Sequence, residues 1–246
     1  MHIREFLGRL KVQLRPKRLY LGYQARRYAR RSEPEIQLLP YVVPPGCTAI
    51  DGGANKGVYS WWLSRLCAHV HAFEPNPDMY DSVRRAVPKN VTVHQLALSD
   101  RAGVSRFCLP TDHGKLLHTR GSLHAVADQE SRWFDVQTAR IDDFTYENLG
   151  FIKLDLEGAE LACLRGAMRT LQEHRPVVLA EATGVGGSSP EELIGCLLDL
   201  GYEVFPLDGS RLEYHGRDPG AIQVGRNCLF MPNLARSQVA RLARSA

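Results

Sequence analysis

The chain has 246 residues, of which 44% are hydrophobic and 24% are charged, and this composition supports the core of one α/β domain or of two small ones. Its six cysteines are scattered singly, without a CxxC pair or a Cys/His cluster, which excludes the ligand spacing of a zinc site and predicts buried thiols in a reducing compartment. Because the sequence has no run of about 18 apolar residues and no apolar secretory signal, we expect a cytoplasmic protein.

Basic charge is concentrated at the start of the chain. Residues 1–31 carry ten Arg and Lys and one Glu, a net charge of +9, while the other 215 residues carry 21 basic and 26 acidic residues, a net charge of −5. Ile3, Phe6, Leu7 and Leu10 share one helical face in this segment. The pattern predicts a basic helix that packs on its own domain or on a partner chain. Peripheral binding to an anionic membrane surface is the first alternative, and nucleic acid is the least favoured.

From Tyr41 onward, short β-rich apolar runs alternate with helical patterns, which predicts a mostly parallel sheet with helices on both faces. The predicted strands are CTAID (47–51), HVHAFE (69–74), VTVHQLAL (91–98), FIKLDL (151–156) and VVLAEA (177–182). Two further strands, YEVFPL (202–207) and NCLFMP (227–232), flank a turn-rich stretch and predict an antiparallel pair at one sheet edge. The predicted parts of the chain are a basic helical segment (1–34), the main domain (35–233) and a basic tail (234–246).

Helices are predicted between these strands. Asn76 precedes a proline and caps one helix, and Ser189 opens a capping box for another. A third helix begins near Ala159 and places Leu161, Leu164, Met168 and Leu171 on one face. Residues 110–135 show no clean periodicity, so we expect a long loop or an excursion over the edge of the sheet that covers a site.

A glycine-rich loop, DGGANKG (51–57), follows the first predicted strand, where an open α/β sheet binds its ligand. A phosphate-binding loop needs Lys and Ser or Thr after its last two glycines, but Val58 and Tyr59 follow here. A dinucleotide loop needs GxGxxG, and neither register of this loop supplies its second glycine. The chain therefore lacks the signature expected of a nicotinamide-dependent oxidoreductase.

The remaining pattern, D-x-G-x-N-x-G, predicts a tight turn without close approach to a pyrophosphate, because Asn tolerates the left-handed conformation almost as glycine does. This favours S-adenosylmethionine as the ligand, with its amine paired to Asp51 and its carboxylate bound by backbone N–H groups of the turn. Glu74 lies 21 residues after Gly53, at a strand end where an acidic side chain can take the ribose hydroxyls. The structural alternative makes Asp51 a helix cap and Glu74 a surface carboxylate.

Several segments, in order along the chain, resemble the FkbM family of S-adenosylmethionine-dependent methyltransferases. They are DGGANKG (51–57), FEPNP (73–77), ALSD (97–100), RIDDF (140–144), FIKLDLEGAELACLRGA (151–167) and VVLAEA (177–182). The resemblance covers about residues 45–232. It implies a class I, Rossmann-like fold with seven strands, mostly parallel, and methyl transfer to a hydroxyl of a sugar, glycan or secondary metabolite.

The resemblance also implies roles for individual residues. The methionine end of the cofactor would meet Asp51, Gly53, Ala54, Asn55 and Gly57. Glu74 would hold the ribose, and Leu98, Ser99 and Asp100 would lie near the adenine. No role follows for residues 1–40, which lie outside the resemblance.

Strand parity places Lys153, Asp155 and Glu157 on one side of the fourth strand. A lysine in a central parallel strand needs a charged partner, and Asp155 or Glu181 can supply one. We therefore interpret Lys153 as a structural strut rather than a catalytic group.

Asp155, Glu157 and Glu181 are predicted to line the rim next to the methyl donor. Crowded carboxylates raise one another's pKa, so one of them can act as the base that takes the hydroxyl proton. The alternative, in which they ligate a divalent cation, is less favoured than a metal-free base. Glu157 can instead be a charge at a helix N-terminus. Among the loop histidines His113, His118 and His124, we rank His124 first as a competing base.

The absence of two motifs narrows the choice of the acceptor atom. The fourth strand is followed by DLEG rather than by the Asn-Pro-Pro-aromatic motif of amino-directed enzymes, and no Pro-Cys nucleophile is present. Oxygen is the acceptor atom that remains. An RNA-directed methyltransferase recruited by the basic segment and a non-catalytic adenosylmethionine-binding protein are the alternatives. The oligomeric state stays open, with a homo-oligomer among the options.

Overall fold

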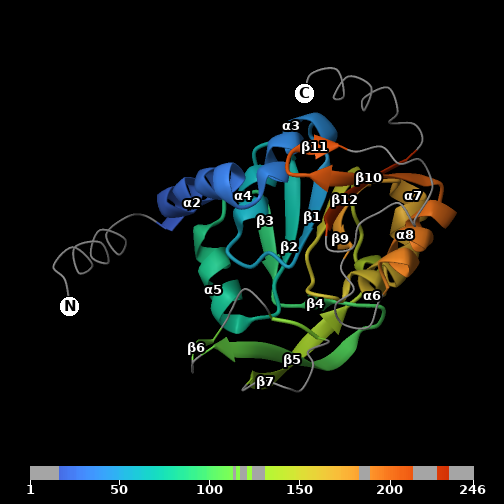
Figure 1. Ribbon diagram of the computed structural model, residues 1–246. Coiled ribbons are helices and arrows are strands. Elements are labelled where there is room, and N and C mark those ends of the chain that lie inside the picture. Colours follow the sequence, from blue (N-terminus) through green and yellow to red (C-terminus); the bar gives the residue numbers. More distant parts are fainter. Residues whose placement is uncertain are drawn as a thin grey trace.

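The computed structural model describes residues 17–112, 115–116, 121–123, 131–182, 189–212 and 226–232. Its main feature is an eight-stranded sheet with the order β11-β10-β12-β9-β8-β1-β2-β3 (Figure 1). Five of these strands pair in parallel: β1 (Thr48–Gly52), β2 (His69–Phe73), β3 (Val91–His94), β8 (Leu149–Leu154) and β9 (Val177–Ala182). The predicted Rossmann-like, mostly parallel sheet is therefore confirmed, and the short β11 (Arg211–Leu212) adds an eighth strand.

The antiparallel pair is also confirmed. β10 (Tyr202–Asp208) pairs with β12 (Arg226–Pro232), and β12 pairs in turn with β9, again antiparallel. The last described strand therefore lies between two strands that precede it in the sequence.

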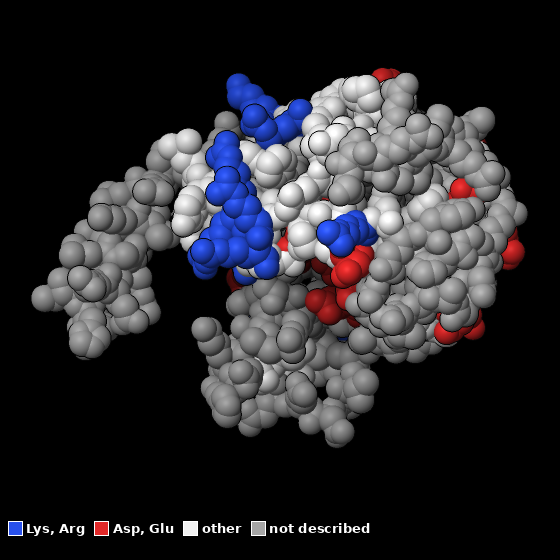
Figure 2. All heavy atoms as spheres, turned by 45° about the horizontal axis from the view of Figure 1, so that its top comes forward, with Lys and Arg blue, Asp and Glu red and all other residues white. Residues whose placement is uncertain are grey.

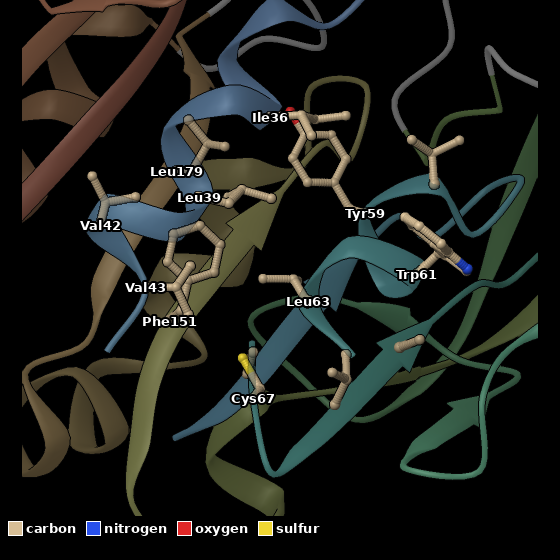
Figure 3. Close-up of a cluster of buried hydrophobic side chains, with 14 of the residues drawn as sticks. Ile36, Leu39, Val42, Val43, Tyr59, Trp61, Leu63, Cys67, Phe151 and Leu179 are labelled. Carbon is tan, nitrogen blue, oxygen red and sulfur yellow. The ribbon is translucent and has the colours of Figure 1, made fainter. Parts of the chain in front are cut away.

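Helices cover both faces of this sheet (Figure 1). On one face, the 3-10 helix η1 (Pro34–Leu38), α3 (Leu39–Val42), α4 (Val58–Leu63) and α5 (Pro77–Ala86) pack on the strands. Figure 3 shows Leu39 and Val43 next to Phe151 of β8, and Ile36 next to Tyr59 of α4. The opposite face is covered by α6 (Glu160–Arg165), α7 (Met168–His174) and α8 (Pro190–Asp199). Because both faces are covered, β1 is buried along its whole length.

The predicted helix starts are present. Asn76 accepts a hydrogen bond from the N–H of Asp78 at 3.1 Å and caps α5, and the Ser189 hydroxyl accepts one from the N–H of Glu192 at 3.1 Å and caps α8.

All six cysteines are free thiols, and Cys196 is the only one of them not fully buried.

The described half of the basic segment forms α2 (Lys17–Arg31), which packs on α4 of the same chain. Leu21, Ala25 and Ala29 are buried there, while Lys and Arg side chains form a band over the helix (Figure 2). The apolar positions predicted at residues 3–10 lie outside the described residues. The domain boundaries at residues 34 and 233 stay predictions. Within the described part of the chain, none of the helices has the length and hydropathy needed to cross a membrane.

Two predicted elements are wrong as single units. VTVHQLAL (91–98) divides into β3 and β4 (Ala97–Leu98), because β4 leaves the main sheet and pairs with Thr138 and Ala139. The helix predicted from Ala159 divides into α6 and α7 at Gly166. A Cβ at Gly166 would lie 2.1 Å from the carbonyl oxygen of Ser99, so the loop after β4 packs where the helix breaks.

Residues 110–135 are not one loop. The two ends of this stretch belong to β5 (Gly103–Asp112) and β7 (Ser131–Ala139), which pair antiparallel in a second sheet of order β4-β7-β5-β6, where β6 is Lys115–Leu116. Phe107, Leu109 and Val136 form its small core. The expectation of an excursion beyond the main sheet is correct, whereas the expectation of irregular structure at both ends is wrong.

Candidate active site

The turn after β1 depends on residues with positive φ angles. Gly53, Asn55 and Gly57 have φ values of +74°, 49° and +75°, so Asn55 takes the left-handed conformation that the sequence predicts. The N–H groups of Gly53 and Ala54 both donate to the carbonyl of Phe73 at 3.0 Å. These bonds fix the turn against the end of β2.

Glu74 ties the loops after β1 and β2 together. Its Oε2 accepts the N–H of Asn55 at 2.7 Å, and its Oε1 accepts the N–H of Asn76 at 2.9 Å. Burial leaves the side chain 5% exposed and raises its pKa to about 7. Each carboxylate oxygen has two lone pairs, so both retain acceptor capacity for a ligand.

Asp51 lies behind the turn. It is 0% exposed, its Oδ2 accepts the Ser60 hydroxyl at 2.5 Å, and its Oδ1 has no partner among the described residues. Burial raises its pKa. Asp51 is absent from the described linings of both cavities around the turn.

The first of these cavities, termed the cleft below, opens where the turn after β1, the end of β2, β4 and the loop after β8 meet. Its open space is about 550 Å³ including the mouth. Phe107, Gly121 and Leu123 of the second-sheet region close one side. Of the predicted residues, it is lined by Gly53, Asn55, Glu74, Leu98, Asp155 and Glu157.

Two residues predicted near the adenine do not line the cleft. The backbone N–H of Ser99 donates to Ala139 at 3.0 Å. Asp100 is exposed and pairs with Arg101 at 3.4 Å. Leu98 is the member of this predicted group whose side chain reaches the site.

A second cavity adjoins the cleft and shares Gly53, Asn55 and Asp155 with it. Its open space is about 710 Å³ including the mouth. Tyr28 and Glu33, which come from α2 and the turn after it, form part of its wall. Sequence reasoning missed both residues, because they precede the resemblance.

Lys153 is the predicted strut. It is 5% exposed, its Nζ lies 3.0 Å from Oδ2 of Asp155, and it lies 4.7 Å above the centre of the Tyr59 ring. Burial opposes its charge, but Asp155 and Asp51 outweigh this effect and raise the pKa of Lys153. Of the two predicted partners, the structure selects Asp155.

The loop after β8 is held by a residue that the sequence analysis did not single out. Glu160 is 2% exposed and accepts the N–H of Leu156 at 2.6 Å and the N–H of Gly158 at 3.0 Å. Glu157 has a φ of 52° and lies ahead of the first helical residue, so Glu160 takes the place at the helix start that we considered for Glu157. An acidic residue in the first turn of a predicted helix is the signal that could have found it.

Glu181 is the half-buried carboxylate of β9. Burial, followed by the charges of Asp155 and Glu160, raises its pKa to about 7. It is not among the described residues that line either cavity. His113, His118 and His124 lie outside the described residues, and within the described ones no group of three or more His, Cys, Asp or Glu side chains is arranged to hold a metal ion.

The order of the strands and the cleft at their carboxyl ends define the class of this protein as a Rossmann-like α/β protein with its ligand site at that edge of the sheet. Its sequence then gives the family: residues 51–204 match the model of the methyltransferase FkbM domain, and the chain belongs to that family.

The chain is also similar to individual proteins. The chain is 25% identical to the methyltransferase sdnD of Sordaria araneosa over 197 residues, which cover 66% of this chain and 76% of that protein. Among solved structures, it is similar to methyltransferase FkbM from Methylobacillus flagellatus KT, with 18% identity and a TM-score of 0.48 over 80% of this chain, and it spans 50% of the length of that protein. A TehB-like SAM-dependent methyltransferase from Corynebacterium glutamicum shows 11% identity and a TM-score of 0.46, covering 87% of this chain and 99% of the other. Both TM-scores are low, so family membership rests on the sequence match.

The methyl donor of this methyltransferase family is S-adenosyl-L-methionine, and the site fits it. Gly53 lets the turn and the loop after β8 approach closely, since a Cβ there would lie 1.9 Å from the carbonyl oxygen of Asp155, and both segments line the cleft. Glu74 offers fixed acceptors at the place expected for the ribose. The Oδ1 of Asn55 is buried without a partner in the described part of the chain, so the turn also offers an unsatisfied acceptor.

Proposed function

We propose that this protein transfers the methyl group of S-adenosyl-L-methionine to a hydroxyl of a sugar, glycan or secondary metabolite. The observation that carries the proposal is the position of Asp155, which lines both the cleft and the second cavity. A carboxylate at that junction can reach an acceptor oxygen placed next to the methyl donor.

The main task of the protein in methyl transfer is to align the acceptor oxygen with the methyl group. When bound, the cofactor would supply a methyl group on a sulfonium sulfur: an acceptor oxygen in line with the C–S bond would attack the methyl carbon, and the sulfur would leave as the thioether of S-adenosylhomocysteine. Holding the acceptor in that line can supply most of the rate. Asp155 then takes the hydroxyl proton, a role that contributes about 10²–10⁴-fold. Lys153 holds the Asp155 carboxylate in place at 3.0 Å.

The other predicted rim residues are less well placed. Glu157 lines the cleft but not the second cavity, and Glu181 is not among the described residues that line either cavity. We therefore rank Asp155 first as the base and retain Glu157 and Glu181 as secondary candidates.

The first test is calorimetric titration with S-adenosylhomocysteine. We expect micromolar binding to the wild type, loss of binding in Glu74→Ala, and unchanged binding in Glu173→Ala, which removes an exposed glutamate of α7. NAD is the control ligand. Binding of NAD, or of neither ligand, would contradict the methyltransferase assignment.

The second test measures transfer of a labelled methyl group to hydroxyl compounds. A methyl ether survives alkali whereas a methyl ester does not, so for acceptors that contain no amino or thiol group, base-stable label in the product identifies attack by a hydroxyl. Asp155→Asn should lower this transfer about 10²–10⁴-fold while still binding S-adenosylhomocysteine. Base-labile product, or transfer to RNA alone, would refute O-methylation of a small acceptor.

A further inference from the structure

The second cavity has walls of both charges. Glu33 and Asp155 contribute carboxylates, and Lys56 and Lys153 contribute ammonium groups. Burying charge in a wall is costly unless the ligand or a neighbour compensates it. A wall with two anions and two cations matches a ligand that itself carries one positive and one negative group.

Within this wall, the Glu33 carboxylate is not fully hydrogen-bonded. Its Oε2 is buried and has no hydrogen-bond partner among the described residues. Burial, the largest effect, raises its pKa to about 7, although the charge of Lys153 opposes this. By contrast, the neighbouring Glu35 is satisfied, because its Oε1 accepts the Tyr59 hydroxyl at 3.1 Å and the Asn227 amide at 2.7 Å. A cation placed beside Glu33 would satisfy its free oxygen.

The second cavity also borders the turn that is expected to meet the amino-acid end of the cofactor. Gly53, Ala54 and Asn55 line it. Asp51, the carboxylate predicted from the sequence to bind the amine, is fully buried behind the turn and bonded to Ser60. Its Oδ1 has no partner among the described residues, but Glu33, unlike Asp51, is among the residues that line the second cavity, and it is therefore the better-placed carboxylate for the amine.

Lys56, which also lines this cavity, provides the matching cation. It is exposed, and its Nζ donates to the Tyr28 hydroxyl at 2.9 Å, which holds it beside α2. Lys153 is already committed to Asp155 at 3.0 Å. Of the two cations in the wall, Lys56 is therefore the one whose ammonium group can turn to a ligand carboxylate.

We propose that the second cavity holds the α-amino-acid end of S-adenosyl-L-methionine, with Glu33 binding its ammonium group and Lys56 its carboxylate. The cofactor site would then extend beyond residues 51–204, where the family match lies, to the turn after α2. The adenosine part would occupy the cleft at Glu74 and Leu98, and the sulfur would lie near Asp155, which both cavities share. The inference rests on the cofactor of the proposed function.

The test compares two ligands that differ only in the amino-acid end. S-adenosylhomocysteine carries it, and 5′-methylthioadenosine lacks it while keeping the adenosine and the thioether sulfur. We expect Glu33→Ala to weaken S-adenosylhomocysteine binding by about 10- to 100-fold, the range of a hydrogen bond to a charged group, and to leave 5′-methylthioadenosine binding unchanged. Lys56→Ala should act in the same way, with a smaller loss because Lys56 is exposed.

Glu147→Ala, which removes an exposed glutamate outside both cavities, is the matched control and should change neither affinity. Equal weakening of both ligands by Glu33→Ala would show a structural role and overturn the proposal, as would no effect on either. If Glu33→Ala raises only the KM for a methyl acceptor, the cavity belongs to the acceptor and the proposal fails while the proposed function stands. Failure of the wild type to bind either ligand would instead contradict the proposed function.

Discussion

At the scale of single residues, Gly53 is a position where the site cannot accommodate a side chain. A side chain there meets the carbonyl oxygen of Asp155 at 1.9 Å, so the turn and the loop after β8 would have to separate. We expect Gly53→Ala to weaken S-adenosylhomocysteine binding at least about tenfold, which corresponds to roughly 1.4 kcal/mol, as measured by calorimetry.

Gly46 offers a matched control for Gly53. Its φ is +69°, close to the +74° of Gly53, but a Cβ there meets nothing within 4 Å. Gly46→Ala therefore carries the left-handed strain of about 1–2 kcal/mol without the clash. It should lower the unfolding temperature and spare ligand binding. Equal binding by both alanine variants would show that the close approach of the two loops does not matter.

The positive charge of Lys153 stabilises the carboxylates around it. Replacing it with Met would leave Asp155 and the buried Asp51 without their nearest cation. We expect Lys153→Met to lower the free energy of unfolding by about 2–3 kcal/mol, less than the roughly 3–5 kcal/mol of a fully buried pair, because the Asp155 side chain is 44% exposed. Urea titration measures this, with Lys56→Met as the exposed control, and an unchanged midpoint would contradict it.

Residues that interact within one strand or one loop could be predicted from the sequence. Residues brought together from distant parts of the chain could not. Strand parity placed Lys153 and Asp155 on one side of the strand, and Asp155 was one of the two partners predicted for Lys153. The loop pattern predicted the left-handed Asn55. Glu33 lies 122 positions before Asp155, and no periodicity relates two residues at that separation. Its contribution to the second cavity follows only from the packing of α2.

At the scale of elements, α2 is part of the folded domain rather than an appendage. Leu21 is 3% exposed and belongs to the same core as α4 and the strands, and Ala25 is fully buried. Gly22 allows the Trp61 ring to approach, since a Cβ would lie 3.2 Å from it. The apolar face of this basic helix is thus occupied by its own chain.

Two leucines on α2 test this packing. Leu21→Ala should cost about 2–4 kcal/mol of unfolding free energy, whereas Leu19→Ala, at a position 68% exposed, should stay within about 0.5 kcal/mol. Thermal or urea unfolding of both variants measures the difference. Similar values for the two would mean that α2 does not dock in solution.

Element types were predictable where one local pattern decides the structure. The strand VVLAEA matches β9 residue for residue, and both predicted caps are occupied. The division of VTVHQLAL and the break at Gly166 were not predictable, because both depend on the loop after β4, which packs against Gly166. The second sheet pairs Gly103 with Thr138, a contact that alternation within either strand does not specify.

At the scale of the whole molecule, buried carboxyl groups give stability a pH dependence. Glu33, Glu74 and Glu181 each have a pKa raised from 4.5 to about 7, with burial as the largest cause. Between about pH 4.5 and 7 these groups hold more protons in the folded chain than in the unfolded one. Their contribution to stability is therefore present below pH 4.5 and is lost as the pH rises through 7.

His71 contributes with the opposite sign. Burial lowers its pKa from 6.5 to about 4, so its contribution is lost as the pH falls through that range. We expect Glu74→Gln to gain stability relative to the wild type as the pH rises from 4.5 to 7, and His71→Asn to gain as it falls from 6.5 to 4. Urea unfolding of the ligand-free protein at several pH values measures both. A pH-independent difference for Glu74→Gln would show that Glu74 titrates normally in the folded chain.

The position of β12 constrains how the chain can be made. Its residues, 226–232, pair with β9 on one side and β10 on the other, although both are synthesised earlier. While the chain is still growing on the ribosome, β9 and β10 each present an unpaired edge that another chain can join. The main sheet closes only after Pro232 has emerged. Emergence of β12, rather than completion of the cofactor turn near residue 57, is therefore the event that covers the facing edges of β9 and β10.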